Sequence, residues 1–117
     1  MNKNYSALTL DELPKRLSSI TAITDQIGTD FSKWQVTEVG DGNLNLVFIV
    51  IGSDGKIVIK QALPYVRVVG ESWPLTLDRA FFEYNALVRQ EERDPGIAPS
   101  VFYFDREQGL IAMECLD

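Results

Sequence analysis

The segment KIVIK, residues 56–60, places three β-branched residues in succession between two lysines and predicts a strand of buried character. Gly-Ser-Asp-Gly at 52–55 precedes it and predicts a hairpin loop. Before that loop, partly alternating apolar residues predict a strand over 44–51 and another that begins within 34–39. Asp-Gly-Asn at 41–43 is typical of a turn between these two. The three strands are therefore expected to form an antiparallel meander.

Ahead of the meander, apolar residues recur at helical spacing between Leu10 and Thr24. Thr9 and Glu12 match a capping box, in which each side chain can satisfy a free backbone N–H at a helix start. The pattern predicts one amphipathic helix that ends near Gly28.

After the meander, residues 65–69 suit an extended piece and residues 70–74 a loop. A second helix is expected from Thr76 to Glu91, since its apolar residues share one helical face. Strands at 101–104 and 110–114 complete the chain. Helix, three strands, helix and two strands predict an α+β fold, in which one helix packs on a five-stranded antiparallel sheet and an extra helix precedes it.

The composition and net charge exclude several classes of binding partner and catalytic site. The 117 residues suffice for one domain, and a formal net charge of -6 argues against a nucleic-acid partner. There is no histidine and one cysteine, Cys115, which excludes a His-dependent triad and an internal disulfide. The polar first thirty residues are unlike a signal peptide, and no apolar run reaches the roughly 18 residues of a membrane span. A reducing, cytoplasmic setting is expected.

One residue is a candidate for binding a phosphate, and a second is a candidate for its ion-pair partner. Lys60 ends the buried strand, where its compact charge can meet nucleotide phosphates, although a solvated strand-end lysine is the alternative. Glu83 lies three residues after Ala80 and four before Leu87, on the flank of the apolar face of the second helix. A carboxylate there costs free energy unless it is paired, so a lysine of the sheet is the expected partner. An exposed helical glutamate is the alternative.

Two further segments carry weaker signals. Glycines at 40 and 42 can let backbone N–H groups approach a phosphate, although by themselves they favour an ordinary turn and the three-glycine kinase spacing is absent. The apolar strand that leads into residues 114–117 suits a hinge against an adenine edge, or a frayed terminus. The order of glycine turn, strand lysine, helical glutamate, two strands and hinge is that of a protein-kinase-like N-lobe.

Three stretches closely resemble the methylthioribose kinase family: EVGDGNLNLVF at 38–48, the residues from IVIK to LDRA at 57–80, and MECLD at 113–117. The family uses ATP to phosphorylate S-methyl-5-thioribose at the anomeric hydroxyl in methionine salvage. The resemblance runs from Glu38 to the end. Its segment ESWPLTLDRA, at 71–80, separates the family from kinase-like enzymes of the aminoglycoside or choline kinase type.

The resemblance implies six ATP-binding residues: Asn43, Lys60, Glu83, Glu114, Cys115 and Leu116. Asn43 would contact the nucleotide in the loop that replaces the glycine-rich loop. Lys60 would hold the ATP phosphates with Glu83 as its ion-pair partner, and the last three residues would form the hinge. The family pattern has aspartate where this chain has Cys115.

The resemblance also implies a division into an N-terminal extension, residues 1–30, and an N-lobe, residues 31–117, that ends at the hinge. The catalytic aspartate, the Mg²⁺ ligands and the sugar-binding arginines would belong to a C-lobe that is absent here, so the isolated chain is expected to be inactive. ATP and ADP are the expected ligands, and methylthioribose only together with a C-lobe. The alternative is a non-enzymatic module that binds nucleotide or another protein, which formation of a homodimer would favour.

Overall fold

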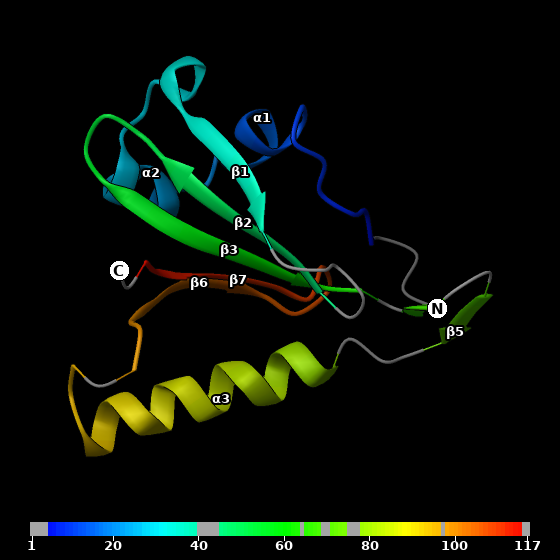
Figure 1. Ribbon diagram of the computed structural model, residues 1–117. Coiled ribbons are helices and arrows are strands. Elements are labelled where there is room, and N and C mark those ends of the chain that lie inside the picture. The colour runs from blue at the N-terminus through cyan, green and yellow to red at the C-terminus, as the bar shows by residue number, and fades with distance from the viewer. Residues whose placement is uncertain are drawn as a thin grey trace.

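The computed structural model describes residues 5–39, 45–63, 65–68, 71–74, 78–96 and 98–115, with only the backbone given for 65–68, 71–74, 78 and 79. Five strands form one antiparallel sheet in the order β1-β2-β3-β7-β6 (Figure 1). Their bounds are Gln35–Val39 for β1, Asn45–Ile51 for β2, Lys56–Ala62 for β3, Leu110–Glu114 for β7 and Val101–Asp105 for β6. The predicted α+β fold with its five-stranded antiparallel sheet is confirmed.

A second, two-stranded sheet joins β4, Tyr65–Val68, to β5, Glu71–Pro74. The extended piece predicted at 65–69 is confirmed, whereas the loop predicted at 70–74 is wrong. Pro74 stands opposite Tyr65 at the open end of the hairpin, where its missing N–H does not interrupt the ladder. A proline and a nearby glycine suggested a loop, but here they stand at the limits of a short strand.

The predicted N-terminal helix is two helices, α1 at Leu13–Leu17 and α2 at Thr21–Ile27. The break follows Ser18, whose hydroxyl donates a 2.8 Å hydrogen bond to the carbonyl of Lys15. Serine side chains compete in this way for backbone partners. Ile20 then adopts an extended conformation, with φ -93° and ψ 105°. The capping interaction of Thr9 is confirmed in one direction, since its Oγ1 accepts from the Glu12 N–H at 3.2 Å.

The two short helices cover one face of the sheet (Figure 1). The break allows both of them to turn apolar side chains toward the strands, where they form the larger hydrophobic core. Its fully buried members include Leu13, Leu17, Ile23 and Ile27 from the helices and Phe48, Val50, Ile57 and Ile59 from the sheet. The segment predicted as an N-terminal extension therefore supplies one layer of the core.

The opposite face is covered by α3, Asp78–Arg93, which lies against β3, β6 and β7 (Figure 1). The predicted second helix is thus present and ends two residues later than Glu91, while its expected N-cap lies outside the described residues. The smaller core beneath it contains Ala62, Ala80, Ile111 and Met113. At its rim, the rings of Tyr84 and Phe104 stack with centroids 4.5 Å apart. In the part of the chain that the structure describes, no helix is long and apolar enough to cross a membrane.

The hairpin turn between β2 and β3 packs tightly against the end of α2. Gly52 N–H donates to the carbonyl of Gly55 at 2.8 Å, which confirms the predicted hairpin loop. The N–H of Asp54 donates to the carbonyl of Ile27 at 3.2 Å. A Cβ atom on Gly52 would lie only 2.0 Å from that same carbonyl oxygen. Glycine therefore allows the N-terminal layer to reach the turn.

We predict that Gly52→Ala lowers the free energy of unfolding by about 1–3 kcal/mol, because the backbone of α2 must shift to admit the methyl group. Urea unfolding followed by circular dichroism measures the change. Ser53→Ala, an exposed position in the same turn, is the matched control and should stay close to the parent protein. Equal stability of the two variants would contradict the close approach of α2.

Candidate functional site

Lys60 lies near the end of β3 and faces the side of the sheet that α3 covers. Cross-strand neighbours share a face, and Lys60 stands opposite Val47 on β2 and Ile111 on β7. Ile111 belongs to the core beneath α3. The strand alternates, so Ile57 and Ile59 point into the other core while Lys60 points toward α3.

Glu83 meets Lys60 from the middle of α3. Its Oε2 atom lies 2.8 Å from the Lys60 Nζ atom. The Glu83 side chain is 35% exposed and the Lys60 side chain 27%, so both remain within reach of water. The ion pair expected from the flank position of Glu83 is present. An ammonium group has three N–H bonds, so a lysine held by one carboxylate can still donate to an anion such as a phosphate.

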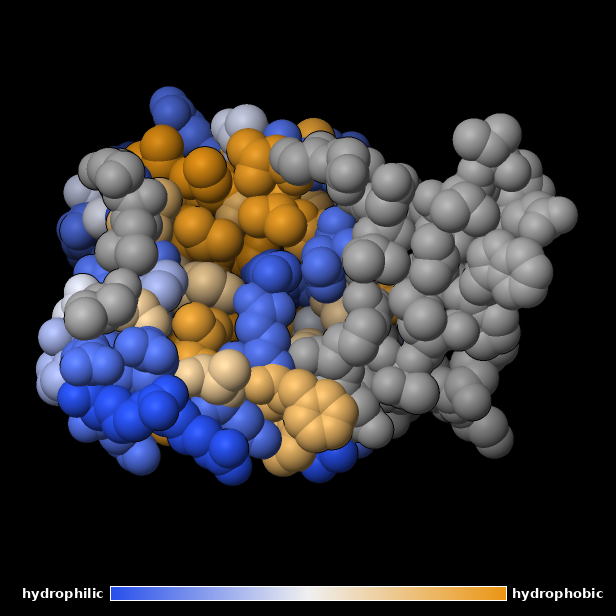
Figure 2. Space-filling model, turned by 60° about the horizontal axis from the view of Figure 1, so that its bottom comes forward, coloured by the Kyte–Doolittle hydropathy of each residue, from blue (hydrophilic) through white to orange (hydrophobic). Residues whose placement is uncertain are grey.

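An apolar surface adjoins this ion pair. Val47 and Ile49 on β2 are only half-buried, and their partners in the register are Lys60 and Val58 on β3. They lie beyond the strands against which α3 packs. Figure 2 shows a broad apolar area on this side of the molecule with a hydrophilic strip beside it. Such a combination, an apolar floor with a few charged groups at its edge, is typical of sites for ring-containing ligands.

The predicted hinge begins at the end of β7, where Glu114 forms hydrogen bonds that join β7 to the start of β6. Its N–H donates to the carbonyl of Ser100 at 2.8 Å, and its Oε1 accepts from the Ser100 N–H at 3.2 Å. Glu114 thus holds the start of β6 with both its amide and its carboxylate. Cys115 is half-buried with a free thiol. A ligand at this edge would be left with the carbonyl of Glu114 and the groups that follow it.

Two predicted site residues, Asn43 and Leu116, lie outside the described residues. The structure therefore brings together only Lys60 and Glu83 of the six, with Glu114 and Cys115 at the end of β7. Binding roles for all six stay predictions.

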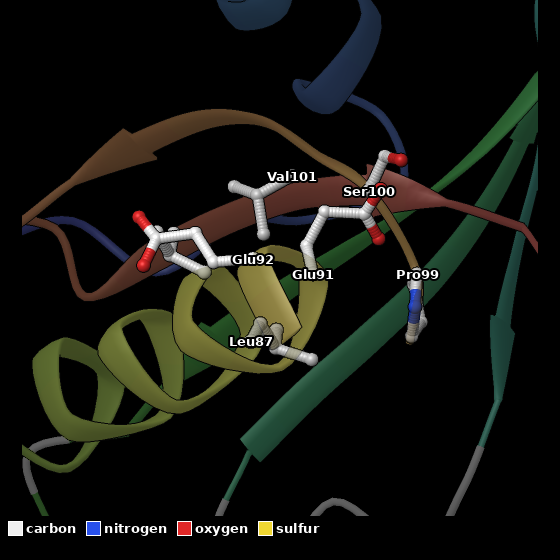
Figure 3. A pocket seen from close by; sticks show the side chains of 7 residues that line it. Leu87, Glu91, Glu92, Pro99, Ser100 and Val101 are labelled. Carbon is white, nitrogen blue, oxygen red and sulfur yellow. The ribbon is translucent and has the colours of Figure 1, made fainter. Parts of the chain in front are cut away.

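A pocket of about 210 Å³ lies between the C-terminal half of α3 and the start of β6. In Figure 3, Glu91 reaches from the helix toward Ser100, with Leu87 and Val101 on the apolar side. The Glu91 carboxylate accepts a 3.2 Å hydrogen bond from the N–H of Gly96. None of the predicted ATP-binding residues lines this pocket, which is distinct from the ion pair. Within the described ranges, no group of three or more His, Cys, Asp or Glu side chains could hold a metal ion.

The residue that sequence reasoning missed is Gln61, next to Lys60 in the chain. Its side chain is fully buried on the face opposite Lys60 and makes three hydrogen bonds. The signal was present, because Ile57, Ile59 and Gln61 share one face of β3 and a glutamine in that series requires buried polar partners.

No model of a known protein family matches the chain. A methylthioribose kinase from Escherichia coli is 50% identical over 114 residues, which are 96% of this chain and 27% of that protein. Methylthioribose kinase 1 of Oryza sativa subsp. japonica is 44% identical over 110 residues, or 92% of this chain and 26% of the relative. The chain is homologous to part of the methylthioribose kinases.

A methylthioribose kinase from Bacillus velezensis is 50% identical over 103 residues, covering 85% of the chain and 26% of that protein. The chain thus spans about a quarter of the length of these methylthioribose kinases. The family resemblance read from the sequence is confirmed over most of the chain. The five-stranded antiparallel sheet with its helices agrees with the N-lobe of a kinase fold.

We predict that Lys60 and Glu83 are coupled in stability by about 0.5–1 kcal/mol, because the pair has a short distance but keeps access to water. Unfolding free energies of Lys60→Met, Glu83→Gln and the double variant give the coupling, which should decrease when salt screens the charges.

The control pair for this cycle is Lys33 with Asp30, whose Nζ–Oδ2 distance is 3.9 Å at 71% and 53% exposure. It should show almost no coupling. A Lys60–Glu83 coupling no larger than that of this surface pair would mean that the contact does not persist in solution.

Proposed function

We propose that this chain is the ATP-binding lobe of a methylthioribose kinase-type enzyme. The observation that carries the proposal is the 2.8 Å contact between Lys60 Nζ and Glu83 Oε2 at the edge of a partly exposed apolar sheet face. Homology over most of the chain to methylthioribose kinases supports it. Neither observation alone would suffice, since strand-end lysines and helical glutamates are common on surfaces.

In the proposed site, Glu83 fixes the direction of the Lys60 side chain so that its ammonium group points along the sheet face. A compact positive charge held in this way can meet the phosphate oxygens of ATP. The apolar surface around Val47 and Ile49 suits the flat base. Asn43 would contact the nucleotide, and residues 114–116 would meet the adenine edge through backbone groups. ATP, when bound, supplies the phosphoryl group.

Phosphorylation of methylthioribose is proposed for the enzyme as a whole and not for these 117 residues alone. Phosphoryl transfer depends on positioned acidic groups and Mg²⁺, which neutralise charge around the phosphates. We assign the Mg²⁺ ligands and the catalytic aspartate to parts of the enzyme that lie outside the described residues. The chain by itself is expected to bind nucleotide without turnover.

We predict that the chain binds MgATP and MgADP at up to millimolar concentration, and that Lys60→Ala weakens binding by about tenfold to a hundredfold. That range corresponds to the loss of one charge-assisted hydrogen bond to a phosphate. Isothermal titration calorimetry on the 117-residue chain measures the affinities.

Lys33→Ala is the matched control, because it removes the same charge from an exposed lysine that pairs with Asp30. It should leave the affinity unchanged. Equal losses in the two lysine variants would show that Lys60 acts only through net charge. Absence of binding in the parent chain would favour the non-enzymatic interaction module, for which sedimentation should then show a homodimer.

A further inference from the structure

Lys60 and Gln61 are neighbours in β3 whose side chains serve opposite faces of the sheet. Lys60 meets α3, whereas Gln61 is 0% exposed within the N-terminal layer. A buried amide must find hydrogen-bond partners, and here the first residues of the described chain supply most of them.

The side-chain amide of Gln61 forms hydrogen bonds with two segments of the chain, the first described residues and the turn before β7. Its Oε1 accepts from the Leu8 N–H at 2.8 Å, and its Nε2 donates to the carbonyl of Ser6 at 3.1 Å. The same Nε2 donates to the carbonyl of Gln108, also at 3.1 Å. Gln61 therefore ties residues 5–8, which we name the N-terminal strap, to β3 and to the turn before β7.

A second set of contacts fastens the strap from outside. The Nη1 atom of Arg16 donates to the carbonyls of Ser6 at 2.9 Å and Ala7 at 3.2 Å. Its Nη2 donates to Gln108 Oε1 at 3.3 Å. The hydroxyl of Tyr5 donates to the carbonyl of Ala62 at 3.0 Å, so the strap reaches the residue after Gln61 as well.

We propose that the N-terminal strap positions Lys60 through Gln61, which acts as a positioning residue for the lysine. Among the described residues, the Lys60 ammonium group meets the carboxylate of Glu83, and 27% of the lysine side chain is exposed. Its place relative to Glu83 depends on where the end of β3 lies. The strap fixes that end from the opposite face by the bonds at Gln61 and Ala62. The consequence for ATP binding rests on the proposed function, whereas the effect on the ion pair does not.

The test compares two variants of the 117-residue chain. Gln61→Met removes the amide at similar volume, and Arg16→Ala removes the outer fastening while leaving the core intact. The first readout is the Cε–Hε NMR signal of Lys60, with Glu83→Gln as the reference for a broken pair. The second readout is the dissociation constant for MgATP. Both variants should move the Lys60 signal toward that reference and weaken MgATP by about threefold to tenfold, as expected for the loss of a supporting hydrogen bond.

Ile23→Ala is the matched control. Ile23 is fully buried in α2 and in the same core, but it makes no hydrogen bond to the strap. This variant should lose thermal stability and keep the Lys60 signal of the parent chain. If Ile23→Ala shifts the Lys60 signal by the same amount, the signal responds to any loss of stability. The strap then has no specific effect on Lys60, and the proposal is overturned.

An unchanged Lys60 signal in folded Gln61→Met and Arg16→Ala also overturns it. If Gln61→Met fails to fold, as circular dichroism would show, Arg16→Ala decides. If the parent chain does not bind MgATP, the proposed function fails, and the NMR comparison still decides whether the strap positions Lys60.

Discussion

The end of strand β3 has to satisfy two different layers at once, and the rest of the structure depends on this constraint. Successive strand residues point to opposite faces, so Lys60 meets Glu83 of α3 while Gln61 enters the N-terminal layer. The contacts with the two layers are therefore only one peptide unit apart in β3. Residues 5–8, far away in the sequence, thus lie directly behind the residue most important for the proposed site.

The two layers of helices bury different sets of apolar side chains. Helices α1 and α2 bury the large apolar side chains of β2 and β3, such as Phe48 and Ile59. With these already in a core, α3 needs to cover only part of the other face, and it lies against β3, β6 and β7. The open part, around Val47 and Ile49, can stay available to a ligand without leaving the sheet unstable. In this small domain the N-terminal layer thus supplies a large part of the apolar burial on the face opposite the proposed site.

Sequence reasoning reached the parts of the fold that local patterns determine. Apolar and β-branched runs bounded by turn residues identified the five strands of the main sheet, and the flank position of Glu83 identified its partner. The break after Ser18 was missed because Leu13, Leu17 and Ile20 continue the helical spacing across it, and only the tertiary packing shows where the chain turns. Strand β5 was missed since its last residue, Pro74, and the glycine that precedes the strand in the sequence suggested a loop. The strap was missed because its bonds to Gln61 and Ala62 span more than fifty residues, beyond the reach of any local pattern.

The hinge shows how a structural role can constrain recognition. Glu114 uses its N–H and its carboxylate on Ser100, and so it fixes β6 against β7 whether or not a ligand is present. In the proposed site, a base at this edge would therefore be read by backbone groups, beginning with the Glu114 carbonyl. Backbone groups are the same in cysteine and aspartate, so Cys115 in place of the aspartate that the resemblance implies would leave such contacts unchanged.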